Sequence, residues 1–359
     1  MTQPQPKESI TKIRPYVAGK SSAAGDVQIV KLSSNENPLG PSPKALEAFE
    51  AQSESLFRYP ASGHDELRSA IAEVENLPSG QIICGAGSDE LIGMLIQSYT
   101  NPGDEVLYTE HGFLMYKIYS LSHGATPRTA PEKDFTADVD ALLAAVTEKT
   151  KIVFIANPNN PTGTYISASE QKRLRDGLRD DIILAIDGAY AEYMEVEDYS
   201  DGRDLVEASD NTIMLRTFSK AYGIPALRVG WAYAPISMID IMNRIRGPFN
   251  VNSAAQAAAA AAIRDVAYTK HVLDVNRTER ARLIEAIATR FKPAPAYGNF
   301  IMVDFGSPAI ATAMNNHLNE HGVIIREIAA YGLPQCLRIS VGSPEENDRL
   351  LEVLEKFQG

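Results

Sequence analysis

The sequence predicts an α/β protein built on a mostly parallel sheet, and two observations lead to that prediction. Short apolar runs recur along the chain, as at Lys151–Ala156, Asp181–Ile186 and Thr212–Arg216. Helical stretches such as Ala137–Thr147 and Ser167–Leu178 separate several of these runs. Apolar strands that alternate with helices are typical of a parallel sheet that is covered on both faces.

The first part of the chain begins with a polar arm and continues with the alternating elements of such a sheet. Residues 1–32 are polar and interrupted by proline and glycine, so we expect an irregular arm. Ser42-Pro43 then opens a helix through Ala51, because serine caps helices and proline fits their first turn. The other elements expected in this part are helices at Glu66–Glu75 and from Glu90 to Tyr99, and strands at Gln81–Cys84, Glu105–Tyr108 and Val229–Tyr233.

The final part of the chain has a mixed pattern that predicts a smaller α+β domain. Ser253–Ile263 is almost pure alanine, which has the highest helix propensity, and a long charged helix around Val272–Arg290 follows. We therefore expect a large domain at residues 33–254 and a small one formed by residues 1–32 and 255–359. The strands expected in the final part are Phe300–Asp304, Gly322–Arg326 and Cys336–Ser340, and the helices are Ala309–His321 and Glu345–Phe357.

Composition and charge exclude several classes of function. The net charge of −12 over 359 residues disfavours nucleic-acid binding, which needs a basic face. No run approaches the ~18 apolar residues of a membrane span, and the start of the chain lacks the apolar core of a signal peptide. Two cysteines, Cys84 and Cys336, are too few for a disulfide framework. We expect a soluble cytoplasmic protein with no nucleic-acid or membrane partner.

The densest cluster of chemically useful side chains follows the apolar run Thr212–Arg216. Thr217 and Ser219 place hydroxyls beside the amine of Lys220, and the guanidinium of Arg228 comes eight residues later. None of these groups helps to build a core. Hydroxyls and a guanidinium suit a phosphate, and a lysine beside them can condense with a carbonyl of the same ligand to form a Schiff base.

Polar groups also stand at the ends of three other expected strands, where open parallel sheets bind ligands. Asn160 lies in a turn after one strand, and its amide can donate to a ligand oxygen. Asp187 closes the next strand, and a carboxylate there needs a cation such as a protonated ring nitrogen. Tyr190 can reach an oxygen of the same ring. The Gly-Ala-Gly-Ser turn at residues 85–88 precedes a helix N-terminus, which favours phosphate.

Three other patterns carry less weight. The turn at residues 85–88 lacks the third glycine of the dinucleotide fingerprint, which disfavours a nicotinamide site. His317 and His321 satisfy a His-x-x-Glu-His zinc pattern, but Gly322 follows as a helix stop. We therefore expect His321 to contact the last helical carbonyls, and no metal site. Asp187 has no acidic partner at a neighbouring strand end, which disfavours a glycosidase.

Together these motifs resemble those of fold type I pyridoxal-phosphate aminotransferases, and more specifically those of the histidinol-phosphate aminotransferase family. The resemblance spans nearly the whole chain in the family's order. It implies a large domain with a mostly parallel central sheet, a smaller α+β domain, and pyridoxal 5'-phosphate as cofactor. The segments that carry it are Arg14-Pro-Tyr16, Ser34–Pro38, Arg58-Tyr-Pro60, Gly87–Glu90, Asn157–Gly163, Asp187-x-x-Tyr190, Thr217–Gly223, Arg228 and Tyr331–Ser340.

The resemblance also implies a role for each site residue. Lys220, Asp187 and Tyr190 would be the catalytic residues. Lys220 would form the Schiff base and move the proton from Cα to C4′, and Asp187 would keep the ring nitrogen protonated. Asn160 and Tyr190 would bind the ring oxygen, and Phe113 would stack on the ring. The phosphate would be held by Ala86, Gly87, Ser88, Thr217, Ser219 and Arg228.

Substrate contacts and a second subunit follow from the same resemblance. Arg338 would bind the anionic group on the substrate's Cα, Arg326 and Tyr16 would bind a second anionic group, and Asn37 belongs to the same set. Tyr59 would reach the phosphate of the neighbouring subunit's cofactor, which implies a homodimer with shared sites. The implied reaction converts L-histidinol phosphate and 2-oxoglutarate into imidazole-acetol phosphate and L-glutamate, in histidine biosynthesis.

Three other activities stay open at this point. An aromatic aminotransferase that acts on phenylalanine or tyrosine could use the same arginines. An amino-acid-phosphate decarboxylase would release carbon dioxide and need no 2-oxo acid. A non-catalytic cofactor-binding regulator would carry a DNA-binding helix-turn-helix segment, which the polar, proline-broken start of the chain does not supply.

Overall fold

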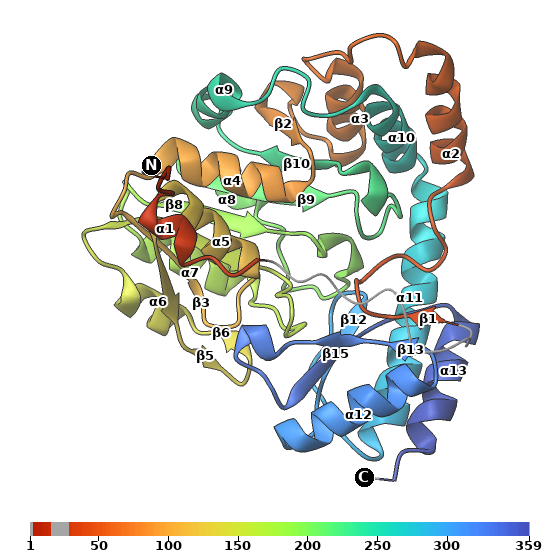
Figure 1. Ribbon diagram of the computed structural model, residues 1–359. Coiled ribbons are helices and arrows are strands. Elements are labelled where there is room, and N and C mark those ends of the chain that lie inside the picture. Colours follow the sequence, from red (N-terminus) through yellow and green to blue (C-terminus); the bar gives the residue numbers. More distant parts are fainter. Residues whose placement is uncertain (1–2, 16–28, 359) are drawn as a thin grey trace.

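The computed structural model describes residues 3–15 and 29–358, and two sheets with helices packed against them organise the chain (Figure 1). The α-helices are α1 Glu8–Thr11, α2 Pro43–Glu50, α3 Asp65–Glu75, α4 Ser88–Tyr99, α5 Leu114–His123, α6 Val139–Ala145, α7 Ala168–Gly177, α8 Arg203–Ala208, α9 Ile236–Ile245, α10 Ser253–Arg264, α11 Val266–Ala288, α12 Pro308–Glu320 and α13 Pro344–Glu355. Short 3-10 helices are η1 Ala51–Ser55, η2 Ser79–Gln81, η3 Ala191–Tyr193, η4 Pro225–Leu227 and η5 Ala329–Tyr331. The strands are β1 Val30–Lys31, β2 Ile82–Gly85, β3 Glu105–Thr109, β4 Thr126–Ala130, β5 Glu132–Lys133, β6 Thr136–Ala137, β7 Thr150–Ala156, β8 Ile183–Asp187, β9 Thr212–Thr217, β10 Gly230–Tyr233, β11 Lys292–Pro293, β12 Phe300–Asp304, β13 Val323–Ile324, β14 Arg326–Glu327 and β15 Cys336–Ser340.

The larger sheet has seven strands in the order β2-β10-β9-β8-β7-β3-β4. β10 is antiparallel to both of its neighbours, and every other pair in this sheet is parallel. The inner strands are buried along most of their length, which explains their continuous apolar runs. The prediction of a mostly parallel sheet is confirmed. Because β7, β8 and β9 run the same way, their carboxyl ends lie together at one edge.

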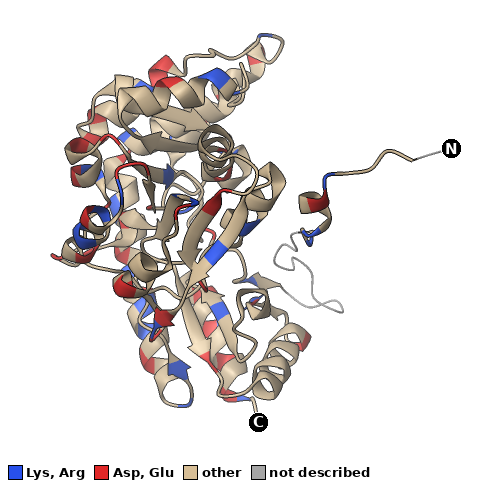
Figure 2. Cartoon of the chain, turned by 90° about the vertical axis from the view of Figure 1, so that its left-hand side faces the viewer, with Lys and Arg blue, Asp and Glu red and all other residues tan. Residues whose placement is uncertain are grey.

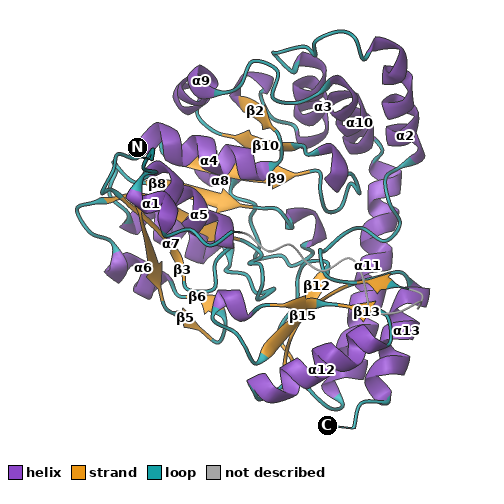
Figure 3. Cartoon of the chain, in the orientation of Figure 1, coloured by secondary structure: helices purple, strands orange, loops and turns teal. Residues whose placement is uncertain are grey.

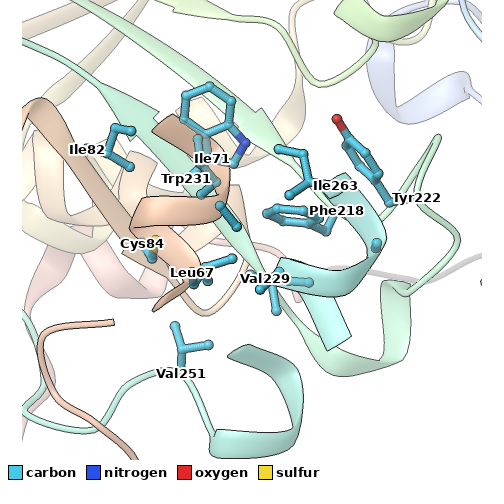
Figure 4. Packing of buried hydrophobic residues seen from close by; sticks show 14 of the residues in the cluster. Leu67, Ile71, Ile82, Cys84, Phe218, Tyr222, Val229, Trp231, Val251 and Ile263 are labelled. Carbon is cyan, nitrogen blue, oxygen red and sulfur yellow. The ribbon is translucent and has the colours of Figure 1, made fainter. Parts of the chain in front are cut away.

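Helices cover both faces of the larger sheet, and three apolar clusters contain residues of its strands. One cluster contains Phe218, Tyr222 and Trp231 and extends to α3 and α10 (Figure 4). Another contains Tyr116 on α5 and Phe154 on β7. α10 packs on α2 and α3, and its alanine side chains allow this close approach.

The smaller sheet has four antiparallel strands in the order β11-β12-β15-β14. Its strands β12 and β15 are labelled in Figure 3. Its core joins residues of α11, α12 and α13 to those of β12 and β15. β1 runs parallel to β13, with Val30 opposite Val323, so the segment after the N-terminal arm is joined to this C-terminal part. The long helix α11 runs from the larger part to the smaller one (Figure 1).

Most expected elements are present with ends shifted by a few residues. The expected strand Gly322–Arg326 is wrong in one respect, because it is divided at Ile325 into β13 and β14, which pair with different strands. β4 was not expected, since it is an exposed edge strand that contains Pro127. The division into domains at residues 33–254 and at residues 1–32 with 255–359 stays a prediction.

Acidic and basic segments are interspersed over the side of the molecule that Figure 2 shows. This distribution accompanies the net charge of −12. Within residues 3–15 and 29–358, no helix combines the length and the apolar character needed to cross a membrane.

Candidate active site

A pocket of about 210 Å³ lies at the carboxyl edge of the larger sheet and is also lined by residues of the smaller sheet. It brings together side chains that are far apart in the sequence. The predicted site residues in its lining are Ser88, Phe113, Asn160, Asp187, Tyr190, Thr217, Ser219, Lys220, Arg228, Arg326 and Arg338.

Lys220 follows β9 and lines this pocket. Its Nζ donates a hydrogen bond to the carbonyl oxygen of Ser34 at 3.1 Å and lies 5.8 Å from the centroid of the Tyr190 ring. Burial, together with the positive charge of Arg338, lowers the pKa of Lys220 to about 8. Such a lysine has a larger neutral fraction near neutral pH, as a nucleophile or base requires.

Asp187 is the last residue of β8, the strand next to β9, and it is only 4% exposed. Oη of Tyr116 donates to its Oδ2 at 2.7 Å, and the backbone N–H of Ala189 donates to its Oδ1 at 3.2 Å. Burial raises the pKa of the Asp187 carboxyl to about 6, although both hydrogen bonds act in the opposite direction. A carboxylate buried in this way is suited to a cationic ligand atom such as a protonated ring nitrogen.

A group of donors surrounds the N-terminus of α4, where Ser88 begins the helix. Nη1 of Arg228 donates to Oγ of Ser219 at 3.3 Å, and Nη2 donates to Oδ2 of Asp89 at 3.1 Å. Gly87 lies so close to this guanidinium that an added Cβ would be 2.5 Å from Nη2, and its φ of +85° also favours glycine. Hydroxyls, a guanidinium and a helix N-terminus together fit an anionic ester group.

Aromatic and amide side chains complete this part of the pocket. Oη of Tyr190 accepts a hydrogen bond from Nδ2 of Asn35 at 2.8 Å. Phe113 precedes α5 and packs edge-on against Tyr116. With Lys220 and Asp187, these groups fit a flat pyridine ring that carries a hydroxyl, an aldehyde and a phosphate, as in pyridoxal 5'-phosphate.

Two arginines enter the pocket from the smaller sheet. Arg326 on β14 lies directly opposite Arg338 on the antiparallel strand β15, so the two side chains share one face of the sheet. Arg338 is 6% exposed and donates from Nη2 to the carbonyl oxygen of Ser33 at 3.0 Å and from Nη1 to Oδ1 of Asn160. Because like charges that face each other across two strands repel, this pair is suited to a ligand with strong negative charge.

A family model for aminotransferases of class I and II matches residues 27–354. The chain belongs to this family. The histidinol-phosphate aminotransferase of Paramagnetospirillum magneticum is 50% identical to this aminotransferase over 100% of both chains. That of Dinoroseobacter shibae is 49% identical over 100% of this chain and 99% of its own length.

Solved structures share the fold of this aminotransferase. The crystal structure of histidinol-phosphate aminotransferase from Sinorhizobium meliloti in complex with pyridoxal-5'-phosphate has a TM-score of 0.91 at 27% identity, and the match covers 99% of this chain and 98% of that chain. A mutant aspartate aminotransferase of Thermus thermophilus has a TM-score of 0.83 at 22% identity, with 98% and 99% covered, and shows likeness of fold alone. The predicted fold type I architecture is confirmed.

Two predicted residues of the aminotransferase use their polar groups outside the pocket lining. The backbone N–H of Ala86 donates to Oε2 of Glu90 at 2.6 Å. Nδ2 of Asn37 donates to the carbonyl oxygens of Gly40 and Ala221, at 3.1 and 3.0 Å. Asn37 therefore connects the turn before α2 to Ala221, the residue after Lys220. It was predicted to bind substrate, but its side chain does not line the pocket.

Another predicted residue, Tyr59, also lies outside the pocket lining. Tyr59 is 82% exposed, and its ring stacks on Phe249 with centroids 4.6 Å apart. Its predicted contact with a neighbouring subunit stays a prediction. Tyr16 lies outside the described residues.

Sequence reasoning missed several residues of the pocket, of which Asn35 is the best connected. Its Nδ2 donates to Tyr190, and its Oδ1 accepts a hydrogen bond from Oγ of Ser340 at 3.1 Å. The signal was present in the segment Ser34–Pro38, but its two asparagines are indistinguishable there without coordinates. The other missed lining residues are Ser33, Ser34, Asp89, Ala156, Pro158, Ala189 and Tyr331.

The zinc-like histidines have a different explanation. Nδ1 of His321 contacts the carbonyl oxygen of His317 at 2.8 Å, which confirms the predicted contact with a helical carbonyl. Nε2 of His317 contacts the carbonyl oxygen of Val353 at 3.0 Å. The His321 ring thus contacts the last turn of α12, and the His317 ring connects α12 to α13.

Proposed function

We propose that this chain is a histidinol-phosphate aminotransferase of histidine biosynthesis that uses pyridoxal 5'-phosphate. It transfers the amino group of L-histidinol phosphate to 2-oxoglutarate and forms imidazole-acetol phosphate and L-glutamate. The observation that carries the proposal is the opposed pair Arg326 and Arg338 in the same pocket as Lys220 and Asp187. Full-length relatives at 50% and 49% identity that bear this enzyme name support the choice of substrate.

The pocket residues divide the work of the reaction. When bound, the cofactor supplies an electron sink for the electron pair that the substrate's Cα keeps when it loses its proton. Asp187 balances the charge of a protonated ring nitrogen, Tyr190 orients the ring through its oxygen, and Arg228 holds the phosphate. Nζ of Lys220 would take the proton from the substrate's Cα and deliver it to C4′ of the cofactor, a task that suits a pKa of about 8.

The two arginines select the substrates. Arg338 binds the anionic group attached to Cα, because its planar guanidinium offers two parallel donors. Arg326 lies opposite and adds a second positive charge that a phosphate or a second carboxylate can engage. The same pair thus serves both the amino donor, which carries phosphate, and the dicarboxylate acceptor.

A homodimer with shared sites belongs to the same proposal. Leu56, Phe57 and Tyr59 are 75%, 77% and 82% exposed, and Phe249, which stacks on Tyr59, is 45% exposed. A group of exposed large apolar side chains is typical of an interaction surface. A second copy of the chain would cover them and bring Tyr59 towards the phosphate of the neighbouring site.

The domain division and the cellular location complete the proposal. Residues 33–254 hold the cofactor, and residues 1–32 and 255–359 close over the substrate. The pocket supports this division into two domains, because Lys220 belongs to the first domain and Arg338 to the second, and both line the pocket. A cytoplasmic location is supported by Cys84 and Cys336, which are free thiols, as is usual in a reducing compartment.

An absorbance titration of the purified, cofactor-loaded protein tests the proposal. Histidinol phosphate should change the absorbance of the bound cofactor at a lower concentration than phenylalanine or tyrosine, and 2-oxoglutarate should restore it. A response to the aromatic amino acids alone would identify an aromatic aminotransferase. Release of carbon dioxide without a 2-oxo acid would identify a decarboxylase.

A further inference from the structure

Tyr116 lies outside the pocket and contacts the carboxylate of Asp187, which lines it. It lies on α5 and is fully buried, and its Oη donates to Oδ2 of Asp187 at 2.7 Å. Tyr116 is not part of the pocket lining, and its hydroxyl is connected to the pocket through Asp187.

The surrounding core fixes the position of this phenol. The Tyr116 ring stacks on Phe154 with centroids 4.5 Å apart and an interplanar angle of 13°, and Tyr108 and Phe113 pack against it edge-on. Its carbonyl oxygen accepts a hydrogen bond from Oγ of Ser120 at 2.6 Å. Because the ring is held on several sides, the hydroxyl is placed at the carboxylate before any ligand arrives.

The phenol is a permanent donor. Burial, together with the negative charge of Asp187, raises the pKa of Tyr116 well above its ordinary value, so its hydroxyl keeps its proton. A neutral donor stabilises the ionised form of a buried carboxyl without cancelling its charge. The full negative charge of Asp187 therefore stays available to a ring nitrogen.

Other charged and titratable groups also face Asp187. The carboxyl of Asp89 on α4 raises the pKa of Asp187, and the backbone N–H of Ala189 acts against that rise. The phenol of Tyr199 is close enough for the Asp187 charge to contribute to the raised pKa of Tyr199. Lys220 and Arg228 line the same pocket. Tyr116 is the phenol whose direct hydrogen bond to Asp187 can be removed by the loss of one oxygen atom.

We propose that Tyr116 is a positioning residue that orients the Asp187 carboxylate and keeps it ionised for the cofactor, and thereby extends cofactor binding to lower pH. This inference rests on the proposed function, because it takes pyridoxal phosphate as the ligand of Asp187. Protonation of Asp187 removes the partner of a protonated ring nitrogen, so cofactor affinity falls on the acid side. Loss of the Tyr116 hydroxyl moves that fall to higher pH.

The test compares cofactor affinity across pH in the full-length protein and in two variants, Tyr116→Phe and Tyr108→Phe. Tyr108 is the matched control, since its ring is 5% exposed and belongs to the same apolar cluster. Equilibrium dialysis against pyridoxal 5'-phosphate gives the dissociation constant at each pH. We call the low-pH range in which cofactor affinity falls the acid limb, and the range above it the plateau. In Tyr116→Phe the acid limb should move to higher pH by about one unit. Binding should then be about tenfold weaker on the acid limb and unchanged at the plateau.

The outcomes separate the inference from the proposed function. An acid limb that moves in Tyr116→Phe and stays in place in Tyr108→Phe supports the positioning role. Identical limbs in all three proteins, or an equal movement in both variants, overturn it. If the wild-type protein itself does not bind pyridoxal phosphate, the proposed function fails, and the inference fails with it for that separate reason. A thermal unfolding curve for each variant confirms that the compared proteins are folded.

Discussion

Arg326 and Arg338 are register partners on two neighbouring strands, and both side chains line the pocket that holds Lys220. Two guanidiniums so placed repel each other in the absence of an anion. A ligand that carries a phosphate or two carboxylates removes this repulsion when it binds. The geometry therefore couples substrate charge to binding in a way that a neutral aromatic side chain cannot reproduce.

Substitution of Arg326 should separate substrates by their charge. Arg326→Gln should lower kcat/KM for histidinol phosphate and for 2-oxoglutarate by about 10- to 100-fold, because a hydrogen bond to a charged group contributes about 1.5–3 kcal/mol. Phenylalanine, if it is accepted, should be affected much less. Steady-state kinetics with each substrate measure this, and Arg349→Gln on the surface of α13 serves as control. Equal losses for all three substrates would contradict the assigned role.

Removal of the pocket amine should stop the reaction and leave the cofactor site intact. Lys220→Ala should lower kcat by about 10⁴-fold, the upper end of what a positioned base contributes, while the protein still binds pyridoxal phosphate. In the wild type, reduction with borohydride should attach the cofactor irreversibly to Lys220, as peptide mass spectrometry can show. Lys31→Ala is the matched control, since Lys31 is also half-buried but pairs with Glu36 at 2.8 Å. Attachment at any other lysine would sink the assignment.

The buried acid of the pocket should make the cofactor-free protein less stable as pH rises. Burial raises the folded-state pKa of Asp187 to about 6 from an ordinary value of 3.8, so the folded state favours the protonated carboxyl. That stabilisation is complete below about pH 4 and is lost as pH rises through about 6, which amounts to about 3 kcal/mol at pH 7. Asp187→Asn should therefore be more stable than the wild type at pH 7 and equal to it at low pH. Urea unfolding at both pH values measures the difference, and a variant that is less stable at pH 7 would refute the prediction.

A buried ion-pair group behind the pocket should dominate the stability of this region. Arg216 on β9 is 4% exposed and pairs with Glu192 at 2.8 Å and with Asp201 at 3.2 Å. Arg216→Met should cost about 3–5 kcal/mol, because it leaves Glu192 as a buried charge without its partner.

Two further variants calibrate that effect. The double variant Arg216→Met with Glu192→Leu should recover part of the loss, since it removes both charges. Arg173→Met, which breaks exposed ion pairs with Asp140 and Glu170, should cost less than about 1 kcal/mol. Urea unfolding of all three variants gives the comparison, and similar losses for the buried and exposed arginines would disprove this account.

The proposed homodimer with shared sites can be tested by a mixing experiment. Tyr59→Ala and Lys220→Ala should each be impaired as homodimers, whereas a mixed dimer contains one site with both residues intact. After dissociation and random reassociation at limiting cofactor, activity should rise to about a quarter of the wild-type value, since half of the dimers are mixed and each has one complete site. Light scattering gives the oligomeric state. Activity that does not rise on mixing, in protein shown to be dimeric, would argue against Tyr59 acting across subunits.

Much of the fold was predictable because its strands are buried on both faces. β7, β8 and β9 each contain a continuous apolar run, and a polar residue follows each run. The runs are Ile152–Ala156, Ile183–Ile186 and Ile213–Leu215. From this contrast the sequence alone predicts that Asp187 and Lys220 belong to one site. The short and exposed strands β4, β5 and β6 lack such a pattern, and the sequence alone did not predict them.

The parts of the site that escaped prediction depend on contacts between distant segments. Asn35 and Asn37 have the same side chain and lie two residues apart, yet Asn35 donates to Tyr190 in the pocket whereas Asn37 donates to the carbonyl oxygen of Ala221. Tyr116 was not predicted, because nothing in the sequence shows that its hydroxyl meets the Asp187 carboxylate.

The pairing of β1 with β13 has a consequence for the order in which the molecule is completed. Ser33, Ser34 and Asn35 come shortly after β1 and line the pocket. The backbone N–H of Asn35 donates to Oγ of Ser340, which is 305 residues away along the chain. A growing polypeptide on the ribosome therefore cannot assemble this wall until its synthesis is almost finished. Prematurely terminated chains would lack a complete pocket, so that only the full-length product could transfer amino groups.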